Sequence, residues 1–206
     1  MGAIRDARRR QRRRRTGVAI LALVALGAYL GIREEAAPTP RDASLLSRPL
    51  HLPSLGPGGR CPVTSGYIVN NSYFGGAALG RGPVQVLLGN AGDVRHGRVD
   101  LGTTEARGWF ALETIWFAVP SYNGPFVVRG GRLGRRGPIE VRPGGTGLIP
   151  GSGPLVVPAG PTINNQGGYR TVPGSTWVKS PGCYAWQVDG KSFSEVIVVN
   201  ALPHSA

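Results

Sequence analysis

The chain has 206 residues, enough for one domain with appended segments, and a formal net charge of +13. Its 33 glycines and 18 prolines approach the level at which disorder is expected, but a hydrophobic content of 41% with four tryptophans argues against a wholly disordered chain. Eight arginines lie within residues 1–16, so much of the charge is a terminal run, and we expect no nucleic-acid partner.

Residues 1–15 form an arginine-rich head, and Thr16–Ile32 follows it without a single charge. At 1.5 Å per residue this run spans about 25 Å, the short end for a transmembrane helix. The positive-inside rule places the arginines in the cytoplasm and the C-terminal part outside the cell. We expect an uncleaved signal anchor at 16–32. A cleaved signal, and hence a secreted protein, is the alternative, because Ala25-Leu26-Gly27 offers small residues at the spacing of a cleavage site.

Residues 33–60 carry five prolines and no sustained hydrophobic period. Prolines at this frequency favour an extended backbone, so we expect a Pro-rich linker that behaves as a disordered stalk. The alternative is that Leu50–Leu55 forms a first edge strand or docks onto a partner.

Residues 61–200 are expected to form one all-β domain, followed by a tail at 201–206. Short runs of β-branched and aromatic residues alternate here with clusters of glycine, proline and asparagine, a pattern that favours a sandwich or barrel over βαβ units. In chain order, the predicted strands are Gly66–Asn70, Val84–Leu88, Gly97–Leu101, Trp109–Val119, Phe126–Arg129, Ile139–Val141, Leu155–Val157, Tyr169–Val172, Trp177–Lys179 and a terminal hairpin.

The longest of these strands, Trp109–Val119, is expected to be central and mostly buried. Alternation gives one face Trp109, Ala111, Glu113, Ile115 and Phe117, and the other face Phe110, Leu112, Thr114 and Trp116. Glu113 is the only charged member. A buried helix of about three turns is the alternative, and the aromatic and β-branched content favours the strand.

The terminal hairpin consists of Cys183–Val188 and Ser192–Val199, which flank Asp189-Gly190. Asp-Gly between β-forming runs predicts a type I′ turn, which needs positive φ at both central positions. The second run ends in Val196–Val199, apolar on both faces, as expected of a strand that is covered on both sides.

Cys61 and Cys183 are the two cysteines of the chain. An exported domain with two cysteines predicts a disulfide that staples the hairpin to the start of the domain. Two unpaired thiols are the alternative. We expect no metal site, because the cysteines lack histidine partners at ligand spacing, and no cofactor.

Four pieces of sequence together resemble a group of uncharacterised secreted or membrane-anchored bacterial proteins. They are CPVT (Cys61–Thr64), LGRGPV (Leu79–Val84), WFAVPSYNGPFVVRGGRL (Trp116–Leu133) and PGCYAWQVDGKSFSEVIV (Pro181–Val198). The resemblance spans about residues 61–199 and implies an all-β domain outside the cytoplasm. Its motifs carry no known activity, so it implies no function.

The Cys-aromatic-x-Trp order in the hairpin resembles immunoglobulin-like sandwiches. The expected fold is therefore an immunoglobulin-like β-sandwich ectodomain behind one N-terminal helix and a stalk. The wide spacing of the cysteines, and Pro181 where a tyrosine corner would have its Tyr, limit this likeness to architecture.

Catalytic residues are not recognised in the sequence, so we expect a protein that is not an enzyme. His96 follows turn residues and reads as a surface histidine, and Glu113 reads as a partly exposed or Arg-paired acid. Tyr122-Asn123-Gly124 and Tyr73-Phe74-Gly75 are loop aromatics that either stack on sugars or cover one end of a sandwich.

Five arginines are close together in sequence and are candidates for contact with an anion. Guanidinium groups suit bidentate contact with phosphate or carboxylate, and a solvated, charge-rich hairpin is the alternative. These residues are Arg129, Arg132, Arg135, Arg136 and Arg142.

The expected function is that of a membrane-tethered extracytoplasmic binding or interaction module. Its partners would be the membrane, through the N-terminal helix, and an anionic lipid, a wall polymer or an envelope protein. The alternative is a hydrolase-like cell-envelope enzyme. A ligand-shaped cleft with Glu113 or His96 at its base would favour that alternative.

Overall fold

The computed structural model describes residues 44–70, 75–89, 92–102, 105–106, 108–134, 139–143, 153–161 and 164–203. The chain separates into two compact units, Met1–Ala37 and Pro38–Ala206, and all the described residues belong to the second. The predicted head, the predicted transmembrane helix and residues 33–43 of the predicted linker lie outside the described residues. In the described part of the chain, no helix is both long enough and apolar enough to cross a membrane.

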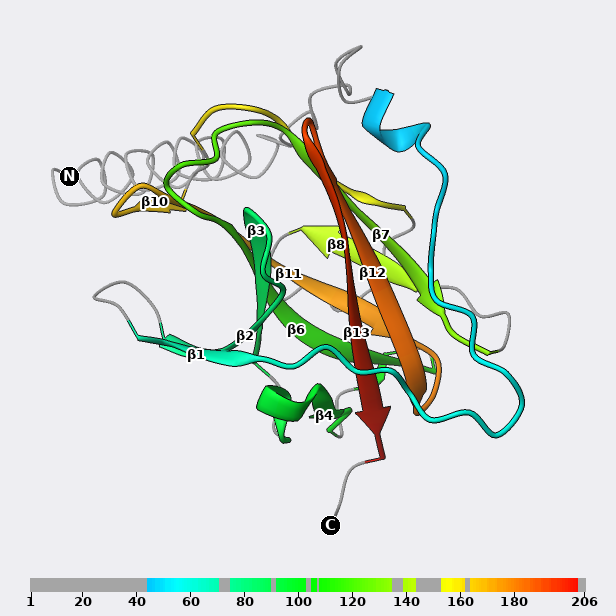
Figure 1. The fold of residues 1–206 in the computed structure, drawn as a ribbon. Coiled ribbons are helices and arrows are strands. Elements are labelled where there is room, and N and C mark those ends of the chain that lie inside the picture. Colours follow the sequence, from blue (N-terminus) through cyan, green and yellow to red (C-terminus); the bar gives the residue numbers. More distant parts are fainter. Residues whose placement is uncertain are drawn as a thin grey trace, which may run out of the picture. The chain divides into compact units, whose positions relative to one another are not determined.

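The domain is all-β and consists of two sheets (Figure 1). We call them sheet A and sheet B. Sheet A contains, in spatial order, β1 (Tyr67–Asn70), β2 (Gly75–Leu79), β3 (Val84–Leu88), β6 (Trp109–Ala118), β11 (Tyr169–Val178) and β10 (Asn164–Gln166), with β5 (Glu105–Ala106) paired to β6 and β8 (Glu140–Pro143) paired to β11. Sheet B contains β4 (Arg98–Asp100), β13 (Phe193–Leu202), β12 (Gly182–Gly190), β7 (Phe126–Arg132) and β9 (Leu155–Val157). Every pairing is antiparallel except that of β4 with β13.

The main core lies between the two sheets and is centred on two tryptophans. Trp116 of β6 and Trp186 of β12 are fully buried and meet edge to face, with ring centroids 5.7 Å apart. Such a pair contributes roughly 0.5–1.5 kcal/mol beyond the burial of its area. The indole Nε1 of Trp186 donates a hydrogen bond to Thr176 Oγ1, at 3.1 Å, so this polar group is satisfied inside the core.

Strand β6 confirms the predicted strand and excludes the helical alternative for Trp109–Val119. It pairs with β3 on one side and with β11 on the other, which makes it central in sheet A. Leu112 and Trp116 face the main core, as the alternation predicts. Glu113 lies on the opposite face, where it is exposed.

Strand β11 is longer than the sequence predicts, because it joins two predicted strands across Pro173-Gly174. Proline usually interrupts a central strand, since it donates no hydrogen bond to the ladder. Here β10 pairs with residues 169–171 and β8 with residues 174–177. Pro173 therefore falls between two short neighbours on that side, where no strand requires its N–H.

The terminal hairpin forms, but its turn lies two residues later than predicted. Asp189 pairs with Ser194, and Gly190 pairs with Phe193, so Lys191-Ser192 makes the connection. Gly190 is needed for space, because a Cβ there would lie 2.0 Å from the Phe193 ring and 2.6 Å from Tyr122 Oη. The Asp-Gly pair thus marks the end of β12, and the prediction of a type I′ turn at these two residues is wrong.

Residues 44–60, which we call the strap, pack along the outward face of sheet B. Figure 1 shows them as the blue-to-cyan stretch that passes beside β7 and β12 before the chain crosses to β1. Leu52 and Leu55 pack against the cluster formed by Leu133, Ala185 and Val198. The strap therefore covers the face of β12 and β13 that points away from the main core. The prediction of a disordered stalk is wrong for this part of the linker. Leu50–Leu55 forms no strand either.

Candidate functional site

The strap is fixed at the hairpin turn by Arg48. Its guanidinium donates hydrogen bonds to the carbonyl oxygens of Gly190 at 2.8 Å, Phe193 at 3.2 Å and Lys191 at 3.2 Å. One side chain thus satisfies three carbonyl groups around a tight turn. This contact ties the start of the strap to the end of β12.

A row of buried polar side chains on β12 receives the strap backbone. Gln187 is 1% exposed; its amide oxygen accepts a hydrogen bond from the His51 N–H at 2.6 Å, and its Nε2 donates to the Pro49 carbonyl oxygen at 3.0 Å. Asp189 is fully buried and lies 2.6 Å from the Arg129 guanidinium. Burial of polar groups is tolerated when each is hydrogen-bonded, so this row specifies where the strap lies.

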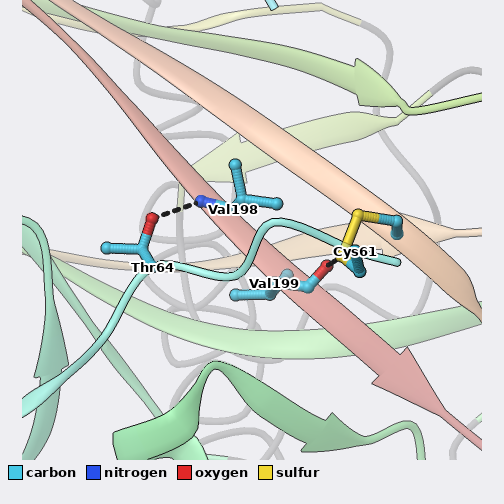
Figure 2. Close-up of a disulfide and its surroundings, with 5 residues drawn as sticks. Cys61, Thr64, Val198 and Val199 are labelled. Carbon is cyan, nitrogen blue, oxygen red and sulfur yellow. Dashed lines mark hydrogen bonds between the residues drawn. A yellow bond between two sulfur atoms is a disulfide. The ribbon is translucent and has the colours of Figure 1, made fainter. Parts of the chain in front are cut away.

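The disulfide lies at the other end of the strap. Cys61 and Cys183 are bonded, with Cα atoms 5.5 Å apart, which confirms the predicted pairing. Figure 2 shows how the chain beyond the bridge stays on β13: the Thr64 hydroxyl accepts a hydrogen bond from the Val198 N–H at 2.9 Å. The Thr64 N–H in turn donates to the Val198 carbonyl oxygen, at 2.9 Å. Strap and terminal hairpin are therefore joined covalently and by hydrogen bonds.

A pocket lies at the end of the domain that carries the β12–β13 turn. Its volume is about 320 Å³, within the range of small-molecule sites. The residues that line it are Pro120, Tyr122, Asn123, Pro161, Gly168 and Arg170. They come from the loop after β6, from the chain after β9 and from the β10–β11 turn, so elements of both sheets build the site.

Tyr122 forms one wall of the pocket and is fixed on several sides. Its hydroxyl donates to the Pro125 carbonyl oxygen at 2.5 Å and accepts from the Lys191 N–H at 3.2 Å. Its ring meets Phe193 edge to face, with centroids 5.3 Å apart. Burial raises the pKa of Tyr122, because the phenolate would lose its hydration.

Arg170 lines the pocket from β11 and is only 2% exposed. Its guanidinium donates to the carbonyl oxygens of Gly124, at 2.8 Å, and Pro158, at 2.6 Å. Its Nε is buried and has no hydrogen-bond partner in the described part of the chain. Burial lowers the pKa of Arg170, although an arginine side chain stays protonated in proteins.

Arg170 is also a buried cation without a counterion among the described residues, whose ion pairs are His96–Asp93 and Arg129–Asp189. Isolated buried charges are costly and are usually paired. This pocket therefore contains a positive charge that two loop carbonyls hold in place and that no carboxylate in the described part of the chain neutralises.

Of the five predicted anion-contacting arginines, the structure describes the side chains of two, and both have partners inside the domain. Arg129 pairs with Asp189. Arg132 donates to Ser180 Oγ and to the Pro181 carbonyl oxygen, each at 2.7 Å. Arg135, Arg136 and the side chain of Arg142 lie outside the described residues.

His96 and Glu113 are not brought to the pocket. The His96 side chain is 73% exposed and lies 2.7 Å from Asp93, and Glu113 is on the outward face of β6. Among the described residues, no group of His, Cys, Asp and Glu side chains could hold a metal ion.

Sequence reasoning singled out Tyr122 and missed Arg170. A signal for Arg170 did exist, because in a strand alternation places it on the same face as Val172. Alternation would have indicated that the Arg170 side chain points into the domain. It could be used only once the residues around Arg170 and Val172 had been assigned to a strand.

Comparison of the sequence with models of protein families found no match, and comparison with curated proteins found none either.

Proposed function

We propose that the chain is a membrane-tethered binding module of the cell envelope. In this proposal, residues 16–32 anchor it with the N-terminus in the cytoplasm. The β domain is then an immunoglobulin-like sandwich that lies outside the cytoplasm and presents its pocket-bearing end to a ligand.

The observation that carries the proposal is the Cys61–Cys183 disulfide. Disulfides form and persist in oxidising compartments and are rare in the cytosol of most cells. The bridge closes a separation of 122 residues, so it links the first and last parts of the folded domain. A domain that is closed by such a bridge is expected in a compartment where the bridge is stable.

The strap supports the tethered arrangement. It is the segment through which any N-terminal anchor must connect to the domain, and Arg48 and the disulfide hold its two ends to β12. A load applied at the N-terminal side would therefore meet ordered structure already at the hairpin turn.

The same contacts support the proposed kinship with the secreted or anchored bacterial group. Its two most distinctive pieces, the CPVT segment and the GCYAWQVDG hairpin, are joined here by the disulfide. The facing sheets with a buried Trp186 beside Cys183 support the immunoglobulin-like description at the level of architecture.

A binding role is favoured over the envelope-enzyme alternative by the composition of the pocket. The features that would have favoured catalysis were Glu113 or His96 at the base of a cleft, and the pocket is lined by neither. It offers a charged group, an aromatic ring and an amide, which are suited to recognition.

The proposal is tested by determining the topology of the full-length chain in a bacterial host. With a different epitope tag at each terminus, protease added to intact spheroplasts should remove the C-terminal tag and leave the N-terminal tag until the cells are lysed. Loss of neither tag before lysis would contradict the proposal. A full-length chain that stays in the soluble cytosolic fraction would contradict it as well.

A further inference from the structure

We propose that the pocket formed by Tyr122, Asn123 and Arg170 binds an acidic sugar unit, that is, a sugar ring carrying a carboxylate or phosphate group. This inference rests on the proposed function, since it names the ligand class of the binding module. Its support does not depend on the membrane topology of the chain and lies in the charge, the walls and the rigidity of the pocket.

The charge of the pocket calls for an anion. Arg170 is 2% exposed and lines the pocket, and no described carboxylate pairs with it. The charges of Arg170 and Arg48 both act on the Tyr122 hydroxyl group. Asp189, the acid near this end of β12, is already neutralised by Arg129 at 2.6 Å. An anionic group in the pocket would supply the missing counterion in a partly desolvated place, where attraction is stronger than in water.

The walls of the pocket suit a compact ring with hydroxyl groups. Tyr122, Pro120 and Pro161 contribute ring carbons to a lining that is otherwise polar, and the Asn123 amide offers both donors and an acceptor. Asn123 is exposed, and no hydrogen bond of its side chain is found among the described residues. A volume of about 320 Å³ admits one small ring rather than a long chain.

The pocket is held in shape before any ligand arrives. Arg170 clamps two loops through the Gly124 and Pro158 carbonyls, and the Gly160 N–H donates to the Asn123 carbonyl oxygen at 3.2 Å. Gly168 has φ +82° and lies so close to Pro120 that a Cβ would meet it at 3.1 Å. A preformed site loses less conformational freedom on binding.

The inference is tested by calorimetric titration of the purified, oxidised full-length chain with three probes. These are glucuronate, glucose 1-phosphate and glucose, which share a ring and differ in charge. We expect saturable binding of at least one charged probe, at least about tenfold tighter than that of glucose. Salt should weaken it only modestly, because partly buried charges are screened less than exposed ones. The ratio of the dissociation constants of the two charged probes shows whether the pocket prefers a carboxylate or a phosphate.

A negative charge introduced at the rim of the pocket distinguishes binding at this site from binding elsewhere on the domain. Asn123→Asp changes the size of the side chain very little and places a negative charge beside Arg170, so binding of the charged probe should weaken at least about tenfold. Ser65→Asp is the matched control, because Ser65 is also exposed. Its neighbour Gly66 donates to the Arg95 carbonyl oxygen, just before β4, and β4 pairs with the end of β13 that is far from the β12–β13 turn. Ser65→Asp should leave binding unchanged. Arg170→Gln should abolish binding, with thermal unfolding as the check that the loops still fold.

Three results would overturn the inference: no saturation with either charged probe, equal affinity for glucose and the charged probes, or an Asn123→Asp chain that binds as the wild type does. The protease experiment on spheroplasts measures membrane topology and not ligand binding. An exported, anchored chain with a silent titration would reject the sugar site alone, and binding by a chain that is not exported would reject the proposed function alone.

Discussion

Asp189 is fully buried, and its carboxylate accepts a hydrogen bond from the Arg129 guanidinium at 2.6 Å. The Arg129 guanidinium also donates hydrogen bonds to two carbonyl oxygens of the strap, those of Leu46 and Arg48, at 3.0 and 2.7 Å. A pair of opposite charges on β7 and β12 thereby becomes the docking point for a segment some 80 residues upstream in the chain. The strap is held by polar contacts at this end and by leucines further along.

We expect Asp189→Asn to lower the free energy of unfolding by about 2–3 kcal/mol, because it leaves Arg129 buried with only neutral acceptors. The loss should be at the low end for a buried pair, since the Arg129 side chain is still 17% exposed. Urea denaturation measures it. The exposed pair of His96 and Asp93 is the control, and Asp93→Asn should cost less than about 1 kcal/mol. Equal losses in the two variants would contradict a special role for the Arg129 pair.

The leucines of the strap provide an internal comparison. Leu52 packs on the outward cluster of sheet B, whereas Leu50 is 44% exposed. We expect Leu52→Ala to cost about 1–2 kcal/mol, less than a fully buried leucine, and Leu50→Ala to cost less than about 0.5 kcal/mol. Hydrogen exchange at the His51 amide, which donates to Gln187, should accelerate in the first variant only. Unchanged exchange would mean that the leucine does not hold the strap.

The disulfide should contribute more than any single strap contact. For a loop closed across 122 residues, the chain-entropy estimate is about 4–5 kcal/mol, and real bridges often deliver less. We therefore expect the double variant Cys61→Ala with Cys183→Ala to lose several kcal/mol of stability. Mass mapping without reductant should recover the two cysteine peptides linked, and free thiols at both positions in the exported protein would reject the bridge.

Single strands with a strong local signal were the part of the fold that could be predicted from sequence. The predicted bounds of Val84–Leu88 and Leu155–Val157 coincide with β3 and β9, because runs of β-branched residues and leucine between glycines and prolines carry a local signal. Strand β2 was missed, because GGAAL lacks β-forming residues. It is a strand because it pairs with β1 and β3, and pairing is a property of the tertiary structure.

The strap illustrates the limit of local reasoning more sharply. The run Val196–Val199, apolar on both faces, predicted that something covers the outward side of β13, and this is confirmed by the packing of Val196 and Val198 in the outward cluster. The prolines of residues 33–60 predicted an extended backbone, and an extended chain is equally compatible with a free stalk and with a docked strap. In the strap, residues 44–46 are helical. The strap docks because the buried polar groups Gln187 and Asp189, the latter through Arg129, bind its backbone. No local sequence pattern reveals that these two side chains are buried.

The predicted arginine group can now be tested more sharply. Arg132 has two hydrogen-bond partners, and its guanidinium lies over the Tyr184 ring, 5.8 Å from the centroid. We expect Arg132→Ser to cost about 1–3 kcal/mol in urea denaturation, as loss of charged hydrogen bonds does. Arg135→Ser with Arg136→Ser is therefore the variant for testing contact with anionic lipid. Binding to anionic vesicles that falls only with Arg132→Ser would attribute the effect to folding and reject the anion-contact prediction.

Tyr122 makes stability depend on pH in the alkaline range. Burial raises the pKa of Tyr122 above its ordinary value, which is about 10, so the folded chain keeps this proton at a pH where the unfolded chain has lost it. Its contribution to stability is therefore complete below about pH 10 and is lost as the pH rises through the raised pKa. Urea denaturation of the oxidised chain between about pH 8 and 11 should show this decline. Tyr122→Phe should flatten it, and so should Tyr67→Phe, because burial raises the pKa of Tyr67 too. A Tyr122→Phe profile as steep as that of the wild type would mean that the Tyr122 hydroxyl is not protected from ionisation by its burial.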